Sequence, residues 1–362
     1  MRIALLGTRG IPANYGGFET FAEELSFRLA QRGHTVTVYC RTNNSTTNAT
    51  LYRGVRRVLL PTISQKYFDT LAHTAFSTAH LLAHRVDVAL YCNGANAILT
   101  AIPRLLGIPT ALNVDGLERK RRKWNALAKG WYLLSERLST WFPNRVVTDA
   151  EVVERYYRER YRKQTTFIAY GADMRREEST DALDALGLKP GEYFLYVSRL
   201  EPENNADLVV DAFEKAGVEQ KLVMVGDAPY ADAFIDRLKQ SHDPRIVFPG
   251  AIYGKGYREL QSHCLAYIHA TEVGGTHPAL IEAMGRGAVT LYLEVPESVE
   301  AAAEAGLSYR DRTELTALIE QVAVMPEDER LRWSEQASQR TRKQYDWDVI
   351  VGRYEDLFNE MS

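Results

Sequence analysis

The alternation of short apolar runs with amphipathic helical segments constrains the fold of this chain more than any other feature of the sequence. Residues 2–7 form a continuous apolar run that ends in glycine, and residues 18–33 then place apolar side chains at helical spacing. Continuous apolar strands separated by helices are typical of a parallel sheet that is covered on both faces. The sequence therefore predicts an α/β fold.

The pattern occurs in two series, and each series predicts one domain. Strands are expected at 2–7, 35–40, 86–92, 109–114, 145–148 and 165–170, and again at 193–198, 221–225, 245–248, 265–269 and 288–293. Residues 171–191 are polar and contain glycine and proline, which is typical of a linker, and residues 326–361 have a helical pattern. We therefore predict two doubly wound Rossmann-like domains, whose ligands bind at the carboxyl ends of the strands.

The chain has 362 residues, which suits two domains, and its net charge of −3 conceals an asymmetry. Residues 1–180 carry a net charge of +11 and residues 181–362 one of −14, which suggests that one half faces an anionic partner. The three cysteines fit neither a disulfide framework nor a metal motif, and no apolar run is long enough to span a membrane. These observations predict a cytoplasmic protein.

The loop after the first strand is rich in glycine and leads into the first helix. Gly7, Gly10, Gly16 and Gly17 do not have the spacing of a dinucleotide-binding fingerprint, and no acidic residue ends the second strand. A nicotinamide dehydrogenase is therefore disfavoured. A turn that needs glycine only for its geometry is one interpretation, but a strand-to-helix loop of this length favours a functional loop.

A second candidate loop follows a strand of the second series and leads into a helix. Pro278 suits the first turn of that helix, and the N–H groups of Ala279 and Leu280 would then face an anion such as a phosphate. Glu282 lies one turn further on, where its carboxylate can accept hydrogen bonds from a ribose. An ordinary capped helix is the alternative.

Five segments together resemble the retaining glycosyltransferases of family 4, and most closely the rhamnosyltransferases of polysaccharide assembly. They are GTRGIPANYGGFETFAEEL at 7–25, NVDGLERKRRKW at 113–124, SRLEPENN at 198–205, VGDAPYAD at 225–232 and EVGGTHPALIEAMGRG at 272–287. The resemblance implies the GT-B fold, in which two Rossmann-like domains face across a cleft. It places an acceptor-side domain at 1–172, with a helix at 345–362 that crosses back to it, and a nucleotide-sugar domain at 173–344.

The resemblance also implies the roles of individual residues. Arg199 matches the arginine that binds the donor diphosphate, where a guanidinium stabilises the charge on the leaving group. The implied donor-binding residues are Gly16, Gly17, Arg199, Asn204, Asn205, Gly274, Gly275, Thr276, Pro278, Ala279, Leu280 and Glu282, and the implied catalytic residues are Arg199, Asp115 and Glu282.

Three positions depart from the pattern of the wider family. A lysine is usual where this chain has Asn204, and the first of two glutamates is usual where it has Gly274, although Glu272 lies nearby. Many relatives have a histidine at the position of Asp115. This aspartate either binds the sugar or orients the acceptor hydroxyl, or it is a structural turn acid. Stabilisation of the leaving group then rests on Arg199, helix N–H groups and Arg9.

The expected acceptor side lies in the basic half of the chain. The implied acceptor-binding residues are Arg9, Glu19, Asp115, Arg119 and Lys120. Residues 118–132 mix cations with tryptophan and tyrosine, and residues 155–163 form a second basic patch, so an anionic membrane surface is the expected partner. A solvated helix face is the alternative. Nucleic acid is not expected, because no nucleic-acid-binding motif accompanies the patches.

The resemblance therefore predicts a retaining transfer of a sugar, namely rhamnose from dTDP-rhamnose, to a lipid-linked or saccharide acceptor in cell-surface polysaccharide synthesis. A UDP-sugar donor is the first alternative, and a non-catalytic nucleotide- or saccharide-binding homologue is the second. Neither a cofactor nor a metal is expected. Asp346 and Asp348 formally match a DxD pattern, but we interpret Asp346 as a helix cap. The expected location is the cytoplasmic side of the inner membrane, as a peripheral protein.

Overall fold

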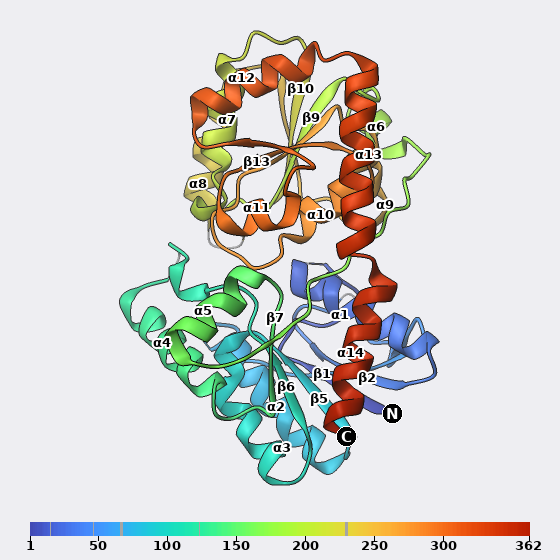
Figure 1. The fold of residues 1–362 in the computed structure, drawn as a ribbon, viewed down its shortest axis with the longest axis vertical. Helices are drawn as coiled ribbons and strands as arrows, with labels where there is room; N and C mark the ends of the chain where they lie inside the picture. The colour runs from blue at the N-terminus through green and yellow to red at the C-terminus, as the bar shows by residue number, and fades with distance from the viewer. Residues whose placement is uncertain (15, 46, 66–67, 123, 229–230) are drawn as a thin grey trace. The chain divides into compact units, whose positions relative to one another are not determined.

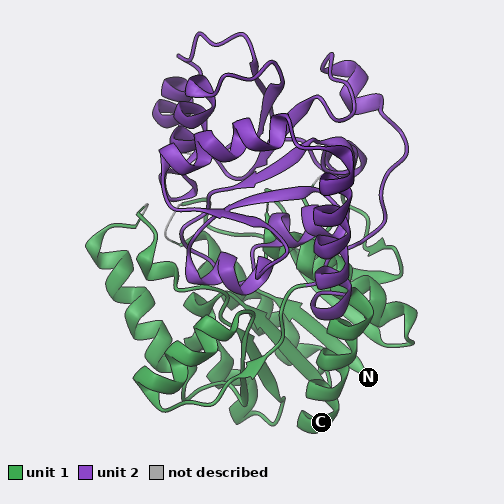
Figure 2. Ribbon diagram, turned by 45° about the horizontal axis from the view of Figure 1, so that its top comes forward, with its two compact units in different colours: residues 1–170, 347–362 green, residues 171–346 purple. Residues whose placement is uncertain are grey.

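The computed structural model describes residues 1–14, 16–45, 47–65, 68–122, 124–228 and 231–362. Tyr15, Lys123, Pro229 and Tyr230 belong to motifs quoted above and lie outside the described residues. The described chain divides into two compact units, which Figure 2 distinguishes by colour. Unit 1 comprises residues 1–170 and 347–362, and unit 2 comprises residues 171–346.

Unit 1 is built on an eight-stranded sheet in the order β3-β4-β2-β1-β5-β6-β7-β8. The strands are β1 (Arg2–Leu6), β2 (Thr35–Arg41), β3 (Leu51–Tyr52), β4 (Val55–Leu60), β5 (Val88–Cys92), β6 (Thr110–Asn113), β7 (Arg145–Thr148) and β8 (Thr166–Phe167). All neighbouring strands pair in parallel except β3 and β4. After β1, the next strands are added on one side of it, beginning with β2. From β5 onward the strands are added on the other side, so the strand order reverses between β1 and β5.

The helices of unit 1 are α1 (Gly17–Gln31), α2 (Asp69–Ala83), η1 (Gly94–Thr100), α3 (Ala101–Leu105), η2 (Glu118–Lys120), α4 (Ala126–Ser139), α5 (Glu151–Tyr161) and the C-terminal α14 (Trp347–Met361). Figure 1 shows α14 alongside α1, although the two lie at opposite ends of the sequence. The Tyr354 ring of α14 packs 5.5 Å from the ring of Phe21, and its hydroxyl accepts a hydrogen bond from Asn113 at 3.1 Å. The last helix of the chain is therefore part of the core of unit 1.

Unit 2 is built on a six-stranded parallel sheet in the order β11-β10-β9-β12-β13-β14. Its strands are β9 (Tyr193–Val197), β10 (Lys221–Val225), β11 (Ile246–Gly250), β12 (Ala266–His269), β13 (Val289–Leu293) and β14 (Leu307–Tyr309). Its helices are α6 (Asp181–Ala185), η3 (Pro202–Asn204), α7 (Ala206–Lys215), α8 (Asp232–Leu238), α9 (Gly254–His263), α10 (Pro278–Gly285), α11 (Pro296–Ala302), α12 (Arg312–Ala323) and α13 (Glu327–Gln344). Here the strand order reverses between β9 and β12.

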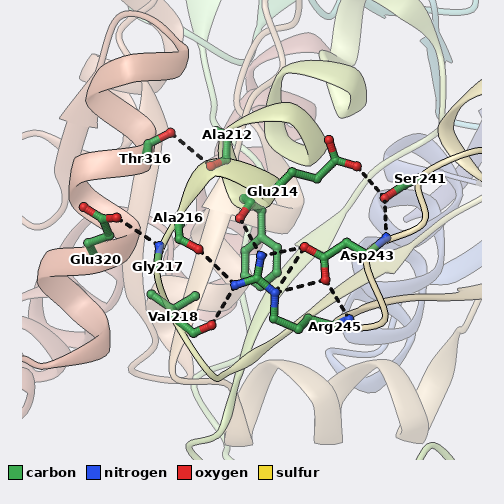
Figure 3. Close-up of polar contacts among 11 residues, drawn as sticks. Ala212, Glu214, Ala216, Gly217, Val218, Ser241, Asp243, Arg245, Thr316 and Glu320 are labelled. Atoms are coloured by element: carbon green, nitrogen blue, oxygen red, sulfur yellow. Dashed lines mark hydrogen bonds and ion pairs between the residues drawn. The ribbon is translucent and has the colours of Figure 1, made fainter.

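A polar network around Arg245 joins the start of β11 to the end of α7 (Figure 3). The guanidinium of Arg245 donates to the carbonyl oxygens of Ala216 at 2.9 Å and Val218 at 2.6 Å, just after α7 ends, and it pairs with Asp243. Carbonyls at the end of a helix lack partners within the helix, and a cation there satisfies them. Arg245 thus joins the end of α7 to the start of β11 and keeps this side of the sheet in place.

Candidate functional site

The carboxyl ends of β9 and β10 come together through a glycine. Gly226 follows β10 with a φ of +152°, and a Cβ at this position would lie 1.9 Å from the carbonyl oxygen of Ser198. Ser198 in turn donates its N–H to Val225 at 3.1 Å. Only glycine permits this approach, which fixes the backbone of Ser198 at the strand end that carries the next residue, Arg199.

Arg199 lies on a loop that is held by neighbouring side chains. Asn204 donates from its amide to the carbonyl oxygen of Arg199 at 2.6 Å, and Tyr196 donates from its hydroxyl to the carbonyl of Asn204 at 2.7 Å. The guanidinium of Arg199 lies 3.6 Å from the carboxylate of Glu201, and 27% of its side chain is exposed. Asn204 is buried, so it supports the backbone of Arg199 at a position where the wider family has a cation.

Asn205 connects this loop to the one that follows β12. It adopts the left-handed conformation, with a φ of +52°, at the start of α7. Its amide donates to the carbonyl of Ala270 at 2.9 Å and to the carboxylate of Glu272 at 3.1 Å. The N–H of Glu272 donates to the carbonyl of Glu203 at 3.0 Å. The loops on either side of the strand-order reversal are therefore joined, and Glu272 is held within that junction.

The loop after β12 leads into α10, which begins at Pro278 with His277 as the preceding residue. The buried rings of His277 and His269 lie 4.5 Å apart. A Cβ at Gly274 would lie 2.8 Å from the ring of His277, so the histidine occupies the space that a glutamate at position 274 would need. Burial, followed by the charge of His277, lowers the pKa of His269 well below its usual value, and this ring is neutral at pH 7.

The first turn of α10 is closed by bonds to His277. The N–H of Leu280 donates to the carbonyl of His277 at 3.0 Å, and the Leu280 side chain is fully buried. The role of Leu280 in donor binding stays a prediction. Pro278 and Ala279 are half-buried, and Gly275 and Thr276 are buried within the loop.

Glu282 lies in α10, and its carboxylate contacts a residue that was not expected from the sequence. The hydroxyl of Tyr257 in α9 donates to Glu282 Oε2 at 2.5 Å. Burial, and next the charge of Glu282, raises the pKa of Tyr257 well above its usual value, so the tyrosine stays a hydrogen-bond donor at neutral pH. A tyrosine 25 residues before its partner gives no local sequence signal of this contact.

In unit 1, two glycines of the first loop serve the geometry of the backbone. Gly7 and Gly10 have φ values of +91° and +108°. Cβ atoms there would lie 2.2 Å from the Cys92 carbonyl oxygen and 2.5 Å from Cys40 Cβ, respectively. Both contacts lie where the strand ends crowd together around β1. For these two positions the structure supports the geometric interpretation of the glycine-rich loop.

The remaining residues of that loop lead into α1 and bring two predicted acceptor residues together. Gly16 precedes α1 in an extended conformation, and Gly17 is its first residue. The carboxylate of the buried Glu19 accepts the N–H of Arg9 at 2.9 Å. The guanidinium of Arg9 donates to the Asn44 side chain at 3.4 Å. Glu19 therefore closes the loop onto the first turn of α1.

Asp115 follows β6 in a strained conformation. Its φ of +56° is uncommon for a residue with a side chain, and its N–H donates to Asn113 at 3.0 Å. The hydroxyl of Tyr170 lies 3.5 Å from Asp115 Oδ1. Burial, followed by the charge of Glu118, raises the pKa of Asp115. Strain combined with a raised carboxyl pKa is typical of functional positions, which supports the functional interpretation of this aspartate.

The basic run after Asp115 separates into residues with different roles. Arg119 pairs with the buried Glu136 at 2.9 Å and donates to Tyr156 at 2.8 Å, and it thereby joins η2 to α4 and α5. Lys120 is exposed. The buried cation is Arg121, which donates to Glu118 at 2.6 Å and whose charge opposes the raised pKa of Asp115. Sequence reasoning missed Arg121, because neighbouring basic residues give no sign of which one turns inward.

Within the described ranges, no three histidine, cysteine, aspartate or glutamate side chains form a group that could hold a metal ion. Every helix in the described part of the chain is too short or too polar to cross a membrane. Asp346 directly precedes α14, and Asp348 lies in the first turn of that helix.

Two family models match the chain, one in each half. Residues 15–176 match the model described as Glycosyltransferase Family 4, and residues 181–340 match the one described as Glycosyl transferases group 1. Comparison with curated proteins gives no match. Two glycosyltransferase domains in this order, each on a Rossmann-like sheet, define the class of the protein. The chain is a glycosyltransferase of the GT-B type, with a Family 4 domain followed by a group 1 domain.

Solved structures share this fold over the full length of the chain. Sucrose-phosphate synthase from Thermosynechococcus elongatus is 18% identical with a TM-score of 0.83, covering 99% of this chain and 98% of its own. HepE from Anabaena, solved with UDP, is 16% identical with a TM-score of 0.78, covering 99% and 100%. WaaG, a glycosyltransferase involved in lipopolysaccharide biosynthesis, is 16% identical with a TM-score of 0.73 and covers 100% of both chains.

Proposed function

We propose that this glycosyltransferase moves a sugar from a nucleotide-diphospho-sugar to a saccharide or lipid-linked acceptor, with retention of anomeric configuration. The observation that carries the proposal is the arrangement at the strand-order reversal of unit 2. There Arg199 after β9, and the loop and first turns of α10 after β12, are joined through Asn205. Reversal points of doubly wound sheets are where nucleotides bind.

Each part of this arrangement has a chemical task in the proposed reaction. Arg199 stabilises the charge that develops on the departing diphosphate, because a guanidinium offers paired N–H donors to phosphate oxygens. Glu282 accepts hydrogen bonds from the ribose. The half-buried Asp115 of unit 1 binds the sugar or orients the acceptor hydroxyl, and Arg9, Glu19, Arg119 and Lys120 belong to the acceptor side. The acceptor hydroxyl then attacks the sugar on the same face from which the diphosphate departs, and the diphosphate takes the proton of that hydroxyl.

The proposed donor is dTDP-rhamnose, because the sequence resembles the rhamnosyltransferases of polysaccharide assembly. A UDP-sugar is the competing donor, and solved structures of the fold neighbour HepE with UDP and with UDP-glucose favour it. A panel of nucleotide-sugars tested by thermal shift separates the two, since stabilisation follows affinity by mass action. Formation of a glycosylated product from the best donor tests catalysis. Donor binding without transfer would favour a non-catalytic homologue instead.

We further propose that unit 1 docks on an anionic membrane at the cytoplasmic face, because α4 exposes an apolar stripe edged by cations. Leu127 and Leu134 lie seven residues apart on α4, and Trp141 lies just after the helix ends. Their side chains are 84%, 48% and 56% exposed, respectively. Arg137 is exposed one turn after Leu134, and its guanidinium is 5.0 Å from the Trp141 ring centroid. An amphipathic helix of this kind buries its apolar face at a lipid interface.

The helix that packs against α4 adds exposed cations to unit 1. Glu136 faces inward from α4 and accepts hydrogen bonds from the hydroxyls of Tyr156 at 2.8 Å and Tyr161 at 3.0 Å, so α5 is attached to the inner side of α4. The exposed arginines of α5 are Arg155, Arg158 and Arg160. Cations near apolar side chains attract anionic headgroups.

Liposome flotation tests the docking proposal with zwitterionic vesicles and with vesicles that contain anionic lipid. We expect recovery with the anionic vesicles, and its loss in the variant with Leu127→Ser and Leu134→Ser. Leu331→Ser in α13, which changes an exposed leucine of unit 2, is the matched control. Equal recovery of the wild type with both kinds of vesicle would refute the electrostatic part of the proposal. Docking and sugar transfer are measured separately, so neither result depends on the other.

A further inference from the structure

Four side chains on α9 and α10 form a hydrogen-bonded chain that ends on Glu282. Arg286 donates to Gln261 Oε1 at 2.7 Å, Gln261 donates to the Tyr257 hydroxyl at 2.9 Å, and Tyr257 donates to Glu282 Oε2 at 2.5 Å. Tyr257 and Gln261 are four residues apart on α9, and Glu282 and Arg286 are four residues apart on α10. Residues at this spacing lie on one face of a helix, so two helices present one pair each.

The chain also fixes the backbone of the helix that carries Glu282. Gln261 has a second amide hydrogen, which it donates to the carbonyl of Ala279 in the first turn of α10 at 3.0 Å. Arg286 donates to the carbonyl of Glu282 at 3.2 Å. Gln261 and Arg286 are buried, and Glu282 is only 9% exposed. In a setting with little water, each of these bonds restricts the group that it reaches.

We propose that Tyr257 is a positioning residue for Glu282, and that Gln261 and Arg286 hold Tyr257 in place, so that the carboxylate meets the ribose of a bound nucleoside diphosphate in a fixed orientation. This inference rests on the proposed function, because it assigns the nucleotide to the site of Glu282. A carboxylate that is oriented before the nucleotide arrives loses less conformational entropy on binding. The expected consequence is an effect on nucleotide affinity more than on the rate of the chemical step.

The test compares two tyrosine-to-phenylalanine variants. Each removes a hydroxyl that donates a hydrogen bond to α9 or α10. Tyr257→Phe removes the donor to Glu282. Tyr193→Phe is the matched control, because the Tyr193 hydroxyl donates to the carbonyl of Leu260 in α9 at 2.7 Å and makes no contact with Glu282. The affinities of both variants and the wild type for UDP and for dTDP are measured by calorimetry, and their unfolding temperatures are measured without nucleotide.

We expect Tyr257→Phe to weaken binding of the preferred nucleotide by about tenfold, because binding must then order a carboxylate that Tyr257 no longer orients. The donor KM rises by a similar factor, and kcat changes little. Tyr193→Phe lowers the unfolding temperature but leaves the affinity unchanged. A second variant, Gln261→Met, breaks the next bond in the chain and weakens binding in the same direction. If Tyr257→Phe and Gln261→Met both fold and bind the nucleotide as tightly as the wild type, the inference is overturned.

A double-mutant comparison shows whether Tyr257 acts through Glu282. Glu282→Gln alone weakens nucleotide binding, and the double variant Tyr257→Phe, Glu282→Gln then binds no more weakly than Glu282→Gln. Losses that multiply in the double variant would show an independent role of Tyr257 and overturn the inference. A wild type that binds neither UDP nor dTDP would instead refute the proposed function itself, and the inference with it.

Discussion

At the scale of single residues, Arg199 is the side chain whose loss we expect to damage catalysis most. Its backbone is held by Asn204 and by the close approach of Gly226 to Ser198, so the loop keeps its shape when the guanidinium is removed. We expect Arg199→Ala to lower kcat/KM by at least about 100-fold, as with other losses of a charge-stabilising donor. The kcat/KM of Arg199→Lys is expected to lie between those of Arg199→Ala and the wild type, because an ammonium cannot bind phosphate in a bidentate way.

A transfer assay with the preferred donor, beside thermal unfolding of the same preparations, checks this prediction. The unfolding temperature of Arg199→Ala should equal that of the wild type. Full turnover in a folded variant would remove Arg199 from the leaving-group site.

The glycine after β10 gives a prediction about stability. Gly226→Ala introduces a Cβ 1.9 Å from the Ser198 carbonyl oxygen, whereas Gly250→Ala, after β11, meets nothing within 4 Å. Both glycines have a positive φ, so both changes incur backbone strain, but only the first also forces two strand ends apart. Urea unfolding should show a clearly larger loss for Gly226→Ala. Equal losses would mean that strain alone explains the glycine.

A buried histidine of unit 1 makes stability depend on pH. Burial, followed by the charge of Arg41, lowers the pKa of His73 from 6.5 to about 4. The ring then binds a proton more readily in the unfolded chain, so lowering the pH from 7 toward 4 favours unfolding. Linkage gives a loss of about 2 kcal/mol at pH 5 from this residue.

Urea unfolding of the wild type and of His73→Gln, compared between about pH 7.5 and about pH 5, checks this prediction. Most of the effect falls in this range, because the pKa of His73 is 6.5 in the unfolded chain and about 4 in the folded one. The variant loses stability less steeply over this interval. Parallel curves for the two proteins would contradict a neutral, buried His73.

At the scale of elements, the sequence predicts best the strands that are apolar throughout. Strands β1 and β10 lie where continuous apolar runs place them, because strands buried on both faces need such runs. Strand β4 was missed because Arg56 and Arg57 interrupt its pattern. Arg57 is nevertheless buried, since carbonyls of the preceding loop, including Ala49 at 2.6 Å, accept its hydrogen bonds.

The candidate site was predictable where it depends on backbone turns and not where it depends on side chains from distant segments. Pro278 marks the start of α10 from its own sequence context, as the structure shows. Tyr257 and Arg121 reach the site regions through tertiary packing. Their partners, Glu282 and Asp115, lie on other elements or across a turn, and no periodicity or motif connects them in the sequence.

The C-terminal helix gives a prediction for a whole element. α14 buries one face in unit 1, including Ile350, Tyr354 and Phe358, and Arg32 and His34 pair with Glu355 on its flank. Ending the chain at Asp346 would expose the apolar surface that this face covers. We expect hydrogen exchange to show loss of protection in unit 1 while unit 2 keeps its protection. A single substitution, Ile350→Ala, should cost about 2–5 kcal/mol in unit 1.

The truncated chain and the full chain are compared under the same conditions, with the strands of each unit as reporters. Full protection of β1 and β5 in the truncated chain would show that α14 is dispensable for unit 1.

At the scale of the whole molecule, the two halves combine opposite charges with different proposed tasks. The basic first half carries the stripe on α4 and the cations of α5, which suits an anionic surface. The acidic second half binds a dianionic diphosphate in the proposal, against its own net charge of −14. Such binding requires local donors to outweigh the distant carboxylates, and screening by salt makes this possible, since distant charges beyond about 10 Å contribute little at 0.1 M salt.

This division predicts where a nucleotide changes the stability of the protein. Saturation with UDP or dTDP at 100 times its dissociation constant should stabilise the unit that binds it by about 2.7 kcal/mol against unfolding. We expect the added hydrogen-exchange protection in unit 2, strongest at the end of β9 and the start of α10, and we expect Arg199→Ala to abolish most of it at the same nucleotide concentration. Protection confined to unit 1 would place the nucleotide on the other sheet and reverse the assignment of donor and acceptor sides.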